Sequence, residues 1–326
     1  MLAASYETSK PGARIELREV PLPTPGPGEV RVKLAVSGVN PTDWKTRQQQ
    51  TPAPPWEFQI PNQDGAGTID LVGQGVSRKR LGERVWVLLA ARGSSWGTAA
   101  EYTVLPSQQA VTLPENASFE LGASLGVPAL TAAYCLNVSG SPQGRTVLVS
   151  GGAGAVGRTA IELARFQGAR QVVATVSNPL KAQIAQQAGA DVTVNYRDAD
   201  CVDQVRSAAP QGIELFVEVA LAVNIGFDLA VAAPHAEIVA YGAAPGEEAA
   251  LPVRAAMMLC LSIHSMLLYQ IREAELQAAV KLTQAAVKQG ALTLPPLTRF
   301  SLEQTEQAHQ AVKDGTVGKV LITLPG

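Results

Sequence analysis

Polar and apolar residues alternate in the first third of the chain, which indicates mainly β structure. Residues 29–36 show the pattern most clearly, because charged and apolar side chains alternate there as in a strand with one buried face. The preceding residues 21–28 contain four prolines, and proline disfavours α-helix at its own position and at the residue before it. Glycine and proline also separate the further strands that we expect, at residues 67–72, 84–89 and 100–104.

Beyond residue 119 the pattern changes to short apolar strands that alternate with helices. This order is typical of a parallel sheet covered by helices on both faces. Two helices and a strand follow residue 270 and cannot all extend that sheet, so we expect the end of the chain to return to the first domain. The strands are expected at residues 146–150, 171–176, 191–195, 215–219, 237–241 and 318–324, and the helices at 119–136, 158–167, 179–188, 272–290 and 302–314.

Two stretches contain no Asp, Glu, Lys or Arg, namely residues 121–144 and 255–271. A membrane-spanning helix needs roughly 20 mostly apolar residues and tolerates polar groups poorly. Pro128 interrupts the first stretch and His264 the second. We therefore interpret both stretches as buried elements of a globular core and expect no membrane segment.

Length, charge and cysteine content narrow the class of protein. The 326 residues exceed what one hydrophobic core usually serves, which favours two domains. The net charge of -2 provides no field that would attract nucleic acid or an anionic membrane. The three cysteines lie far apart and form neither a disulfide framework nor a zinc cluster. Because the N-terminus also lacks the pattern of a signal peptide, we expect a cytoplasmic protein.

The strongest chemical signal is a glycine-rich segment that follows the apolar strand at 146–150. It contains the motif Gly152-x-Gly154-x-x-Gly157 and opens the helix expected at 158–167. Glycines let the backbone turn sharply and approach a pyrophosphate, and a helix N-terminus offers free N–H groups to it. In this strand–turn–helix context the motif predicts a dinucleotide-binding site.

The end of the next strand indicates which dinucleotide binds. Proteins that bind NAD usually have an Asp or Glu there, about 20 residues after the glycines, which accepts a hydrogen bond from the ribose 2′-hydroxyl. This chain has Ser177 instead, and Lys181 follows four residues later. A hydroxyl and an ammonium would bind the 2′-phosphate that a carboxylate would repel, so NADP(H) is favoured. The alternative is that Lys181 is a solvated helix residue.

Several further segments resemble the medium-chain dehydrogenase/reductase superfamily and, within it, the zinc-free quinone oxidoreductases of the zeta-crystallin type. The resemblance extends over nearly the whole chain, and the order and spacing of its segments are more specific than any one of them. They are Ser-Gly-Val-Asn-Pro at 37–41, Asp-Gly-Ala-Gly at 64–67, Gly-Ala-Ser-Leu-Gly-Val-Pro-Ala-Leu-Thr-Ala at 122–132, the glycine loop, Val-Asn-Tyr-Arg at 194–197, Glu-Val-Ala-Leu-Ala-Val-Asn at 218–224 and Gly-Lys-Val at 318–320.

The resemblance implies an α/β protein with a GroES-like β-barrel catalytic domain at 1–122, a Rossmann NADP(H)-binding domain at 123–265 and a return to the catalytic domain at 266–326. Tyr196 and Lys181 would hold the 2′-phosphate, and Asn40, Thr131 and Tyr241 would lie at the nicotinamide end. Family members often form dimers by pairing the edge strands of two Rossmann sheets, which Leu-Pro-Val at 251–253 would suit. The cofactor-binding residues implied are Asn40, Thr131, Gly152, Ala153, Gly154, Ala155, Val156, Ser177, Lys181, Tyr196, Tyr241 and Gly242.

No metal site is expected. Zinc-dependent relatives use a Cys near position 40 and a His-Glu pair before the Gly-x-Gly stretch, where this chain has Asn40 and the pair Gln63-Asp64. Amide side chains are poor zinc ligands compared with thiolate or imidazole. The three histidines are scattered and lack the spacing of a ligand set.

One residue departs from the quinone oxidoreductase pattern. Close relatives carry a Tyr five residues after the Asn that matches Asn40, whereas this chain has Lys45, as some fungal enoyl reductases of the superfamily do. Lys45 could polarise a carbonyl or protonate an enolate, and it could equally point to solvent. The adjacent Trp44 could stack on a flat acceptor or belong to the core.

Three functions remain open. The first is an NADPH:quinone oxidoreductase with Asn40 and Lys45 as candidate catalytic residues, and the second is an NADPH-dependent enone or enoyl reductase. The third, of another class, is a cofactor-binding structural or RNA-binding protein of the crystallin type, against which the near-neutral charge argues. The sequence does not identify the acceptor, because the family forms its acceptor pocket from variable loops such as residues 48–58 and 90–97.

Overall fold

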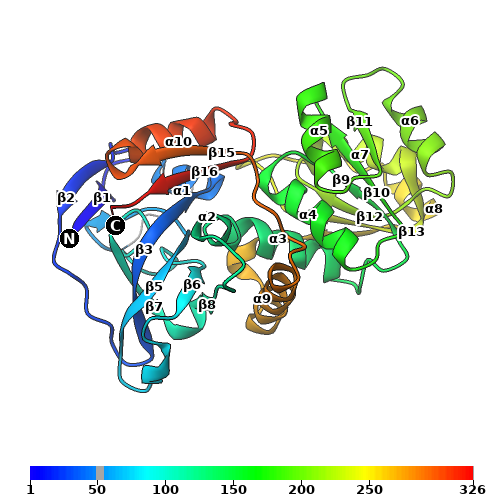
Figure 1. The fold of residues 1–326 in the computed structure, drawn as a ribbon. Helices are drawn as coiled ribbons and strands as arrows, with labels where there is room; N and C mark the ends of the chain where they lie inside the picture. Colours follow the sequence, from blue (N-terminus) through cyan, green and yellow to red (C-terminus); the bar gives the residue numbers. More distant parts are fainter. Residues whose placement is uncertain (49–54, 326) are drawn as a thin grey trace. The chain divides into compact units, whose positions relative to one another are not determined.

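The computed structural model describes residues 1–48 and 55–325, which divide into two compact units (Figure 1). Unit 1 consists of Met1–Val127 and Leu294–Gly326, and unit 2 of Pro128–Thr293. The family resemblance implies a return to the catalytic domain at residue 266, whereas residues 266–293 group with unit 2. The physical reason is that helix α9 (Glu273–Lys288) packs within this unit against α4 (Ala155–Phe166).

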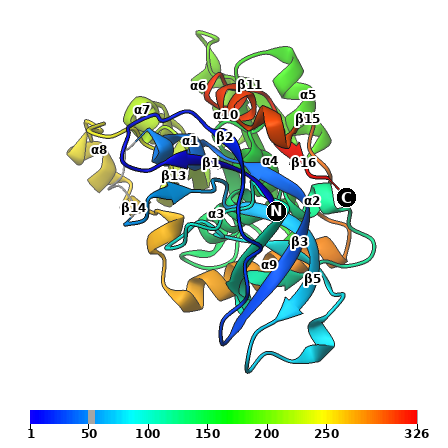
Figure 2. The same ribbon diagram turned by 90° about the vertical axis from the view of Figure 1, so that its left-hand side faces the viewer.

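Unit 1 is mainly β structure. Its strands are β1 (Leu2–Glu7), β2 (Glu16–Glu19), β3 (Glu29–Val39), β4 (Phe58–Gln59), β5 (Asp64–Val72), β6 (Arg84–Val87), β7 (Tyr102–Pro106), β8 (Ala110–Thr112), β15 (Leu297–Ser301) and β16 (Lys319–Thr323). The main sheet has the order β15-β16-β3-β5-β6-β8, with β7 also paired to β3. Its long strands β3 and β5 lie side by side (Figure 2). β3 buries Val30, Val32 and Leu34 in the core of unit 1, as the alternation of its side chains predicts.

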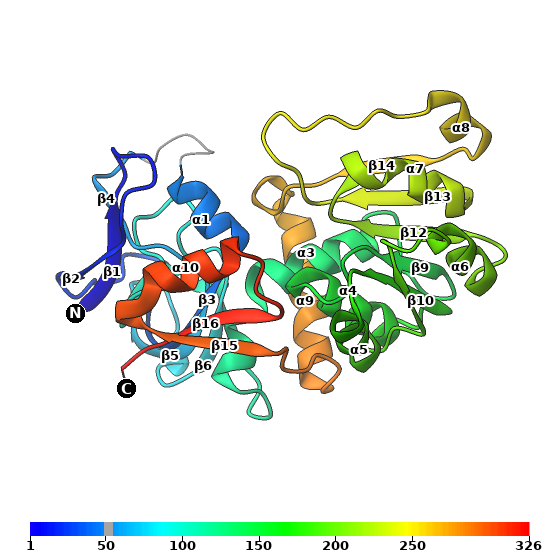
Figure 3. The same cartoon turned by 90° about the horizontal axis from the view of Figure 1, so that it is seen from above.

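Helices of unit 1 are short and cover part of this sheet. They are α1 (Pro41–Arg47), α2 (Phe119–Gly122), α10 (Thr305–Lys313) and the 3-10 turns η1 (Arg78–Arg80), η2 (Ser107–Gln109) and η4 (Leu302–Gln304). α10 lies along β15 and β16 and contacts α1 (Figure 3). The last 33 residues of the chain thus contribute two strands and a helix to the unit that the first 127 residues begin.

Unit 2 contains one parallel sheet. Its strands are β9 (Thr146–Val149), β10 (Gln171–Val176), β11 (Val192–Asn195), β12 (Ile213–Glu218), β13 (Ala232–Ala240) and β14 (Ser262–Ser265), in the order β11-β10-β9-β12-β13-β14. The other elements are α3 (Gly126–Asn137), which starts at the border of the units, α5 (Pro179–Gln187), α6 (Cys201–Ala208), α7 (Leu221–Val231), α8 (Val253–Met258) and η3 (Leu268–Gln270). The strand order reverses between β9 and β12, so right-handed crossovers place α4 and α5 on one face and α7 on the other.

Two sequence-based expectations about elements need correction. The helix expected at 119–136 is two helices, α2 and α3, because the chain turns at residues 123–125. The uncharged stretch 255–271 is not a buried core element, since Met257 and Met258 on α8 are 71% and 77% exposed. In the described part of the chain, no helix is long and apolar enough to cross a membrane.

Candidate functional site

The glycine loop of unit 2 has the backbone geometry that a dinucleotide requires. It joins β9 to α4, and a Cβ on Gly157 would lie 2.3 Å from the carbonyl oxygen of Gly151, so only glycine fits at that position. The loop is held by hydrogen bonds from Gly152 N to the carbonyl of Thr175 (3.0 Å) and from Gly154 N to the carbonyl of Gly151 (2.9 Å). Gly154 is the N-cap of α4, whose first turn has no acidic residue. The free N–H groups of this turn can therefore receive a phosphate.

The loop lies where the strand order reverses, which is where open α/β sheets bind ligands. Glu218, at the end of β12, accepts hydrogen bonds from the backbone N–H of Ala220 and from Nδ2 of Asn224, the latter at 3.0 Å. The same Asn224 amide lies 3.1 Å from Oγ of Ser150 at the end of β9. These bonds fix the ends of β9 and β12 relative to each other. Burial raises the pKa of Glu218 above its ordinary value.

Three of the residues predicted for the adenosine end lie at adjoining strand ends. Ser177 is buried directly after β10, and Tyr196, directly after β11, donates its backbone N–H to the carbonyl of Val176 at 3.1 Å. Lys181 is in the first turn of α5, where Asn178 caps the helix by accepting a hydrogen bond from the Lys181 backbone N–H. The Lys181 ammonium pairs with no other residue among those that the structure describes, so a phosphate can approach it.

Outside the glycine loop and the adenosine end, unit 2 contains three more predicted residues, namely Thr131, Tyr241 and Gly242. Thr131 is a buried residue of α3, 5% exposed. Tyr241 follows β13 and donates its backbone N–H to the carbonyl of Glu218 at 3.0 Å, which ties it to the end of β12. Burial raises the pKa of the Tyr241 phenol well above its ordinary value, so Tyr241 stays protonated. A Cβ on Gly242 would lie 2.4 Å from the carbonyl oxygen of Val219, a close approach that requires glycine.

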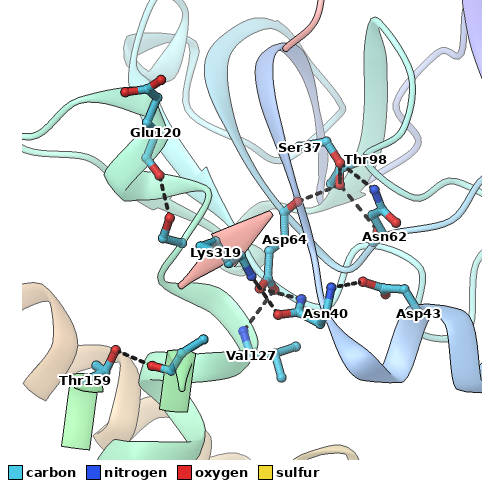
Figure 4. A network of polar contacts seen from close by, with 12 residues as sticks. Ser37, Asn40, Asp43, Asn62, Asp64, Thr98, Glu120, Val127, Thr159 and Lys319 are labelled. Carbon is cyan, nitrogen blue, oxygen red and sulfur yellow. Dashed lines mark hydrogen bonds and ion pairs between the residues drawn. The ribbon is translucent and has the colours of Figure 1, made fainter. Parts of the chain in front are cut away.

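In unit 1, Asn40 belongs to a buried polar cluster with Asp64 and Lys319, shown in Figure 4. The Lys319 ammonium donates hydrogen bonds to Oδ1 of Asn40 at 2.6 Å and to Oδ2 of Asp64 at 3.2 Å. Nδ2 of Asn40 donates to the same oxygen of Asp64 at 2.7 Å. The three side chains are at most 2% exposed. Burial raises the pKa of Asp64, an effect that the Lys319 charge and the Asn40 amide partly offset.

Further hydrogen bonds hold Asp64 and Asn40 in place within this cluster. The second oxygen of Asp64 accepts the backbone N–H of Val127 at 2.9 Å, and a Cβ on Gly126 would lie 2.0 Å from that oxygen. On the other side, Asp43 accepts the backbone N–H of Asn40 at 2.7 Å and so caps α1. Burial, and then the negative charge of Asp64, raise the pKa of Asp43 to about 8.

Lys45 lies on α1 beside Trp44. Its ammonium is 5.9 Å from the centroid of the Trp44 ring, and the ammonium of Lys313 on α10 is 5.7 Å from that centroid. Trp44 is half-buried between neighbours that carry positive charge, so it is not a core tryptophan. Part of the acceptor loop expected at 48–58, residues 49–54, lies outside the described residues.

The structure therefore places Asn40 and Lys45 in unit 1 and the other predicted site residues in unit 2. The sequence analysis did not predict that Asp64 and Lys319 contact Asn40, although both residues lie in segments that resemble the family. A signal was present, because Lys319 belongs to the strand expected at 318–324 and directly precedes its apolar residues 320–322. A lysine that is buried with such a strand requires a polar partner.

The residues at the positions of zinc ligands do not fit a zinc ion. The Lys319 ammonium contacts both Asn40 and Asp64, and a positive charge there would repel a metal cation. The described residues contain no group of three or more His, Cys, Asp or Glu that could hold a metal ion. The absence of metal remains a prediction that needs measurement.

Comparison with known proteins gives matches over the whole chain. One family model, described as the alcohol dehydrogenase GroES-like domain, matches residues 26–115, and a second, described as zinc-binding dehydrogenase, matches residues 155–285. Over 310 residues the chain is 29% identical to the quinone oxidoreductase of Sus scrofa, covering 94% of this chain and 92% of that protein.

Solved structures extend the comparison to the fold. An NAD-dependent alcohol dehydrogenase superposes with a TM-score of 0.89 at 27% identity and covers 100% of both chains. A mycobacterial protein solved in complex with NADPH superposes with a TM-score of 0.85 at 27% identity, covering 99% of this chain and 100% of that one.

A GroES-like β unit, and a parallel sheet with a glycine loop where its strand order reverses, define an oxidoreductase that uses a nicotinamide dinucleotide. The chain belongs to the medium-chain dehydrogenase/reductase superfamily. Within that superfamily it belongs to the quinone oxidoreductase family of the zeta-crystallin type, and the resemblance stated from the sequence is confirmed.

Proposed function

We propose that the protein is a zinc-independent NADPH:quinone oxidoreductase. The observation that carries the proposal is that Ser177, and no carboxylate, follows the end of β10, with Lys181 in the first turn of α5 and Tyr196 at the adjoining end of β11. These groups suit a 2′-phosphate, whereas NAD is usually recognised by a carboxylate at the end of β10. Arg197, whose guanidinium carbon lies 5.9 Å from the centroid of the Tyr196 ring, adds positive charge at the same edge.

NADPH, when bound, would supply the hydride that reduces the acceptor. The chain's own residues would position the cofactor: the glycine loop and the first turn of α4 hold the pyrophosphate, and Thr131 and Tyr241 support the nicotinamide end. Asn40 would orient the nicotinamide or the acceptor by hydrogen bonds from its amide. A quinone suits a site of this kind because quinols and semiquinones take their protons from water, so no dedicated protein acid is needed.

The second candidate is an NADPH-dependent enone or enoyl reductase, which the position of Lys45 favours. Reduction of an enone requires a proton at the α-carbon, and the Lys45 ammonium on α1 is the group of unit 1 that could deliver it. Its contact with the Trp44 ring leaves its three N–H groups without an anionic partner among the described residues. This reductase would share the cofactor site of the first candidate.

An acceptor screen tests the proposal. Oxidation of NADPH and of NADH is followed at 340 nm with 9,10-phenanthrenequinone and 1,4-benzoquinone, and separately with methyl vinyl ketone and 2-hexenal. The proposal predicts faster turnover of the quinones and a preference for NADPH. Turnover of the enones alone, lost in Lys45→Met, would establish the second candidate. Tight binding of NADPH without turnover of any acceptor would instead favour a structural, crystallin-type role.

We also propose that the protein is a homodimer that pairs through unit 2. β14 is an edge strand of the parallel sheet, because it pairs with β13 on one side and with no described strand on the other. Exposed apolar side chains occur on this strand and on the preceding helix α8, namely Ile263 on β14 and Met257 and Met258 on α8. An open strand edge beside apolar surface is a feature that proteins usually cover, and a second copy of the same edge would do so symmetrically.

A further inference from the structure

We infer that Lys319 and Asp64 are positioning residues that hold the Asn40 side chain in one orientation. The inference rests on the proposed function, in which Asn40 contacts the nicotinamide end of the cofactor or the acceptor. Neither residue is expected to touch the reacting atoms. Their effect on turnover would come through Asn40 alone.

The charges of the two partners determine which way the Asn40 amide faces. Its oxygen accepts from the Lys319 ammonium at 2.6 Å, and its nitrogen donates to the Asp64 carboxylate at 2.7 Å. If the amide turned over, its N–H groups would face the ammonium and its oxygen the carboxylate, and both contacts would become repulsive. An isolated asparagine has no such preference. One amide hydrogen is used by Asp64, and the second bonds to no described residue.

Four separate segments form this cluster, namely the end of β3, the start of β5, residues 126–127 and the start of β16. Gly38 on β3 leaves the space that the cluster needs, because a Cβ there would lie 3.1 Å from Cε of Lys319 and 2.1 Å from the carbonyl oxygen of Ala123. Gly126 makes room for the Asp64 carboxylate, and Val127 donates its N–H to it at 2.9 Å. β16 pairs with β3 directly beside Asn40, through Val320 opposite Val39. Lys319 therefore reaches Asn40 from the final strand of the chain.

Stability alone does not explain an ion pair at this position. Removing two charges from water is costly, and replacing a buried pair by apolar residues of similar volume is often neutral or stabilising. Lys319 lies on a strand whose next three residues, Val320, Leu321 and Ile322, are apolar and buried. A leucine or methionine would suit that environment. The pair is explained if its purpose is to keep one polar side chain, that of Asn40, in a fixed orientation.

A cycle of three variants tests the inference: Lys319→Met, Asp64→Asn and the double variant. Each single variant leaves one buried group without its partner, so the single variants should unfold at lower urea concentration than the double variant. Turnover should behave differently. In all three variants kcat with NADPH and 9,10-phenanthrenequinone should fall by at least about tenfold, as for the loss of one charged hydrogen bond, while the Kd of NADPH changes little. In an Asn40→Ala background, Lys319→Met should lower kcat no further.

A second readout does not depend on catalysis. The side-chain amide resonance of Asn40 in ¹⁵N-labelled protein is identified by its loss in Asn40→Ala, and its hydrogens should exchange slowly with solvent in the wild type. Lys319→Met should speed this exchange by at least about tenfold, because the amide loses a charged hydrogen bond. Ile322→Ala, a buried change on the same strand whose side chain belongs to the hydrophobic core of unit 1, should lower stability and leave both the exchange and kcat nearly unchanged.

The outcomes separate this inference from the proposed function. If the double variant recovers both stability and kcat, the ion pair is only structural and the inference is wrong. If the wild type reduces no quinone, the proposed function fails, and the amide exchange alone decides: unchanged exchange in Lys319→Met overturns the inference, and faster exchange supports it. If Lys319→Met does not fold, the same comparison is made with Asp64→Asn.

Discussion

Single residues in unit 1 form a chain of buried hydrogen bonds whose direction can be assigned. Nδ2 of Asn62 donates to Oγ of Ser37 at 2.9 Å, and the Ser37 hydroxyl lies 2.7 Å from that of Thr98, which donates to the carbonyl of Asp64 at 2.6 Å (Figure 4). Because the Asn62 amide nitrogen is used in this way, its oxygen must accept the hydrogen of His309 Nε2, at 2.9 Å. His309 therefore carries a hydrogen on Nε2, and through Asn62 it supports the strand end that carries Asp64.

His309 leads to a prediction about acid stability. Burial, and secondarily the Arg47 charge, lower the pKa of His309 to about 3, below its ordinary value of about 6.5. As the pH falls below 6.5, the unfolded chain binds a proton at this histidine and the folded protein does not, so stability is lost on acidification. Between pH 7 and pH 5 this loss should be about 2 kcal/mol in the free energy of unfolding.

The comparison with His309→Gln isolates this contribution from that of other titrating groups. Asp43 and Asp228 have the opposite effect, because burial raises the pKa of each to about 8 and their contribution to stability falls as the pH rises from about 4 to 8. In urea titrations, the difference in stability between wild type and His309→Gln should shrink by about 2 kcal/mol from pH 7 to pH 5. A difference that stays constant over this range would show that His309 takes up its proton over the same pH range in the folded protein as in the unfolded chain.

At the scale of elements, the buried parallel strands were predictable and several exposed or short elements were not. β9, β10 and β12 each contain a run of three consecutive apolar residues, so the sequence pattern locates them. β14, with the sequence Ser-Ile-His-Ser, lies in a stretch without charged residues that suggested a core element. Its exposure results from its place at the sheet edge, which depends on the strand order and not on composition. α1 was missed because Asn40 before Pro41 reads as a turn, although Asn40 is the N-cap and Pro41 the first residue of the helix.

The prediction about cofactor choice concerns Lys181, which lies in the first turn of α5. Lys181→Ala should weaken NADPH binding by about tenfold to a hundredfold, the range of one charge-assisted contact to a phosphate, and should leave NADH binding nearly unchanged. The preference for NADPH should also decrease at high salt, which screens partly exposed charges. Fluorescence titration of both cofactors measures this, with Lys281→Ala on the exposed face of α9 as a matched control. Equal loss of NADPH and NADH binding in Lys181→Ala would show that this lysine does not recognise the 2′-phosphate.

At the scale of the whole molecule, segments far apart in the sequence form each candidate site. The glycine loop could be recognised because strand, turn and helix follow one another directly. The cluster of Asn40, Asp64 and Lys319 could not, because its members are separated by 24 and 255 residues along the chain. The antiparallel pairing of β16 with β3 brings the last strand to Asn40. The local sequence pattern of either strand does not indicate which strand it pairs with. The family resemblance supplied the motifs but not their contacts.

The edge of unit 2 gives a prediction about assembly. In light scattering after gel filtration, the wild type should have about twice the mass of one chain, because apolar surface at an open strand edge favours self-association. A variant that carries Met257→Glu and Met258→Glu should be monomeric, since the charges would be buried without partners in the interface. The two methionines are largely exposed within one chain, so the folding stability of the monomer should change little. A wild type that is monomeric at micromolar concentration would contradict the proposed dimer.

The central claim is that Asn40, with the ion pair behind it, occupies the place of a metal and that NADPH reduces a quinone without one. The most direct test is the rate of NADPH oxidation with 9,10-phenanthrenequinone before and after dialysis against a strong chelator, together with elemental analysis of the same samples. The account predicts less than one zinc per chain, an unchanged rate after chelation and a strongly reduced rate in Asn40→Ala. One tightly held zinc per chain, whose removal abolishes turnover and whose return restores it, would contradict the account.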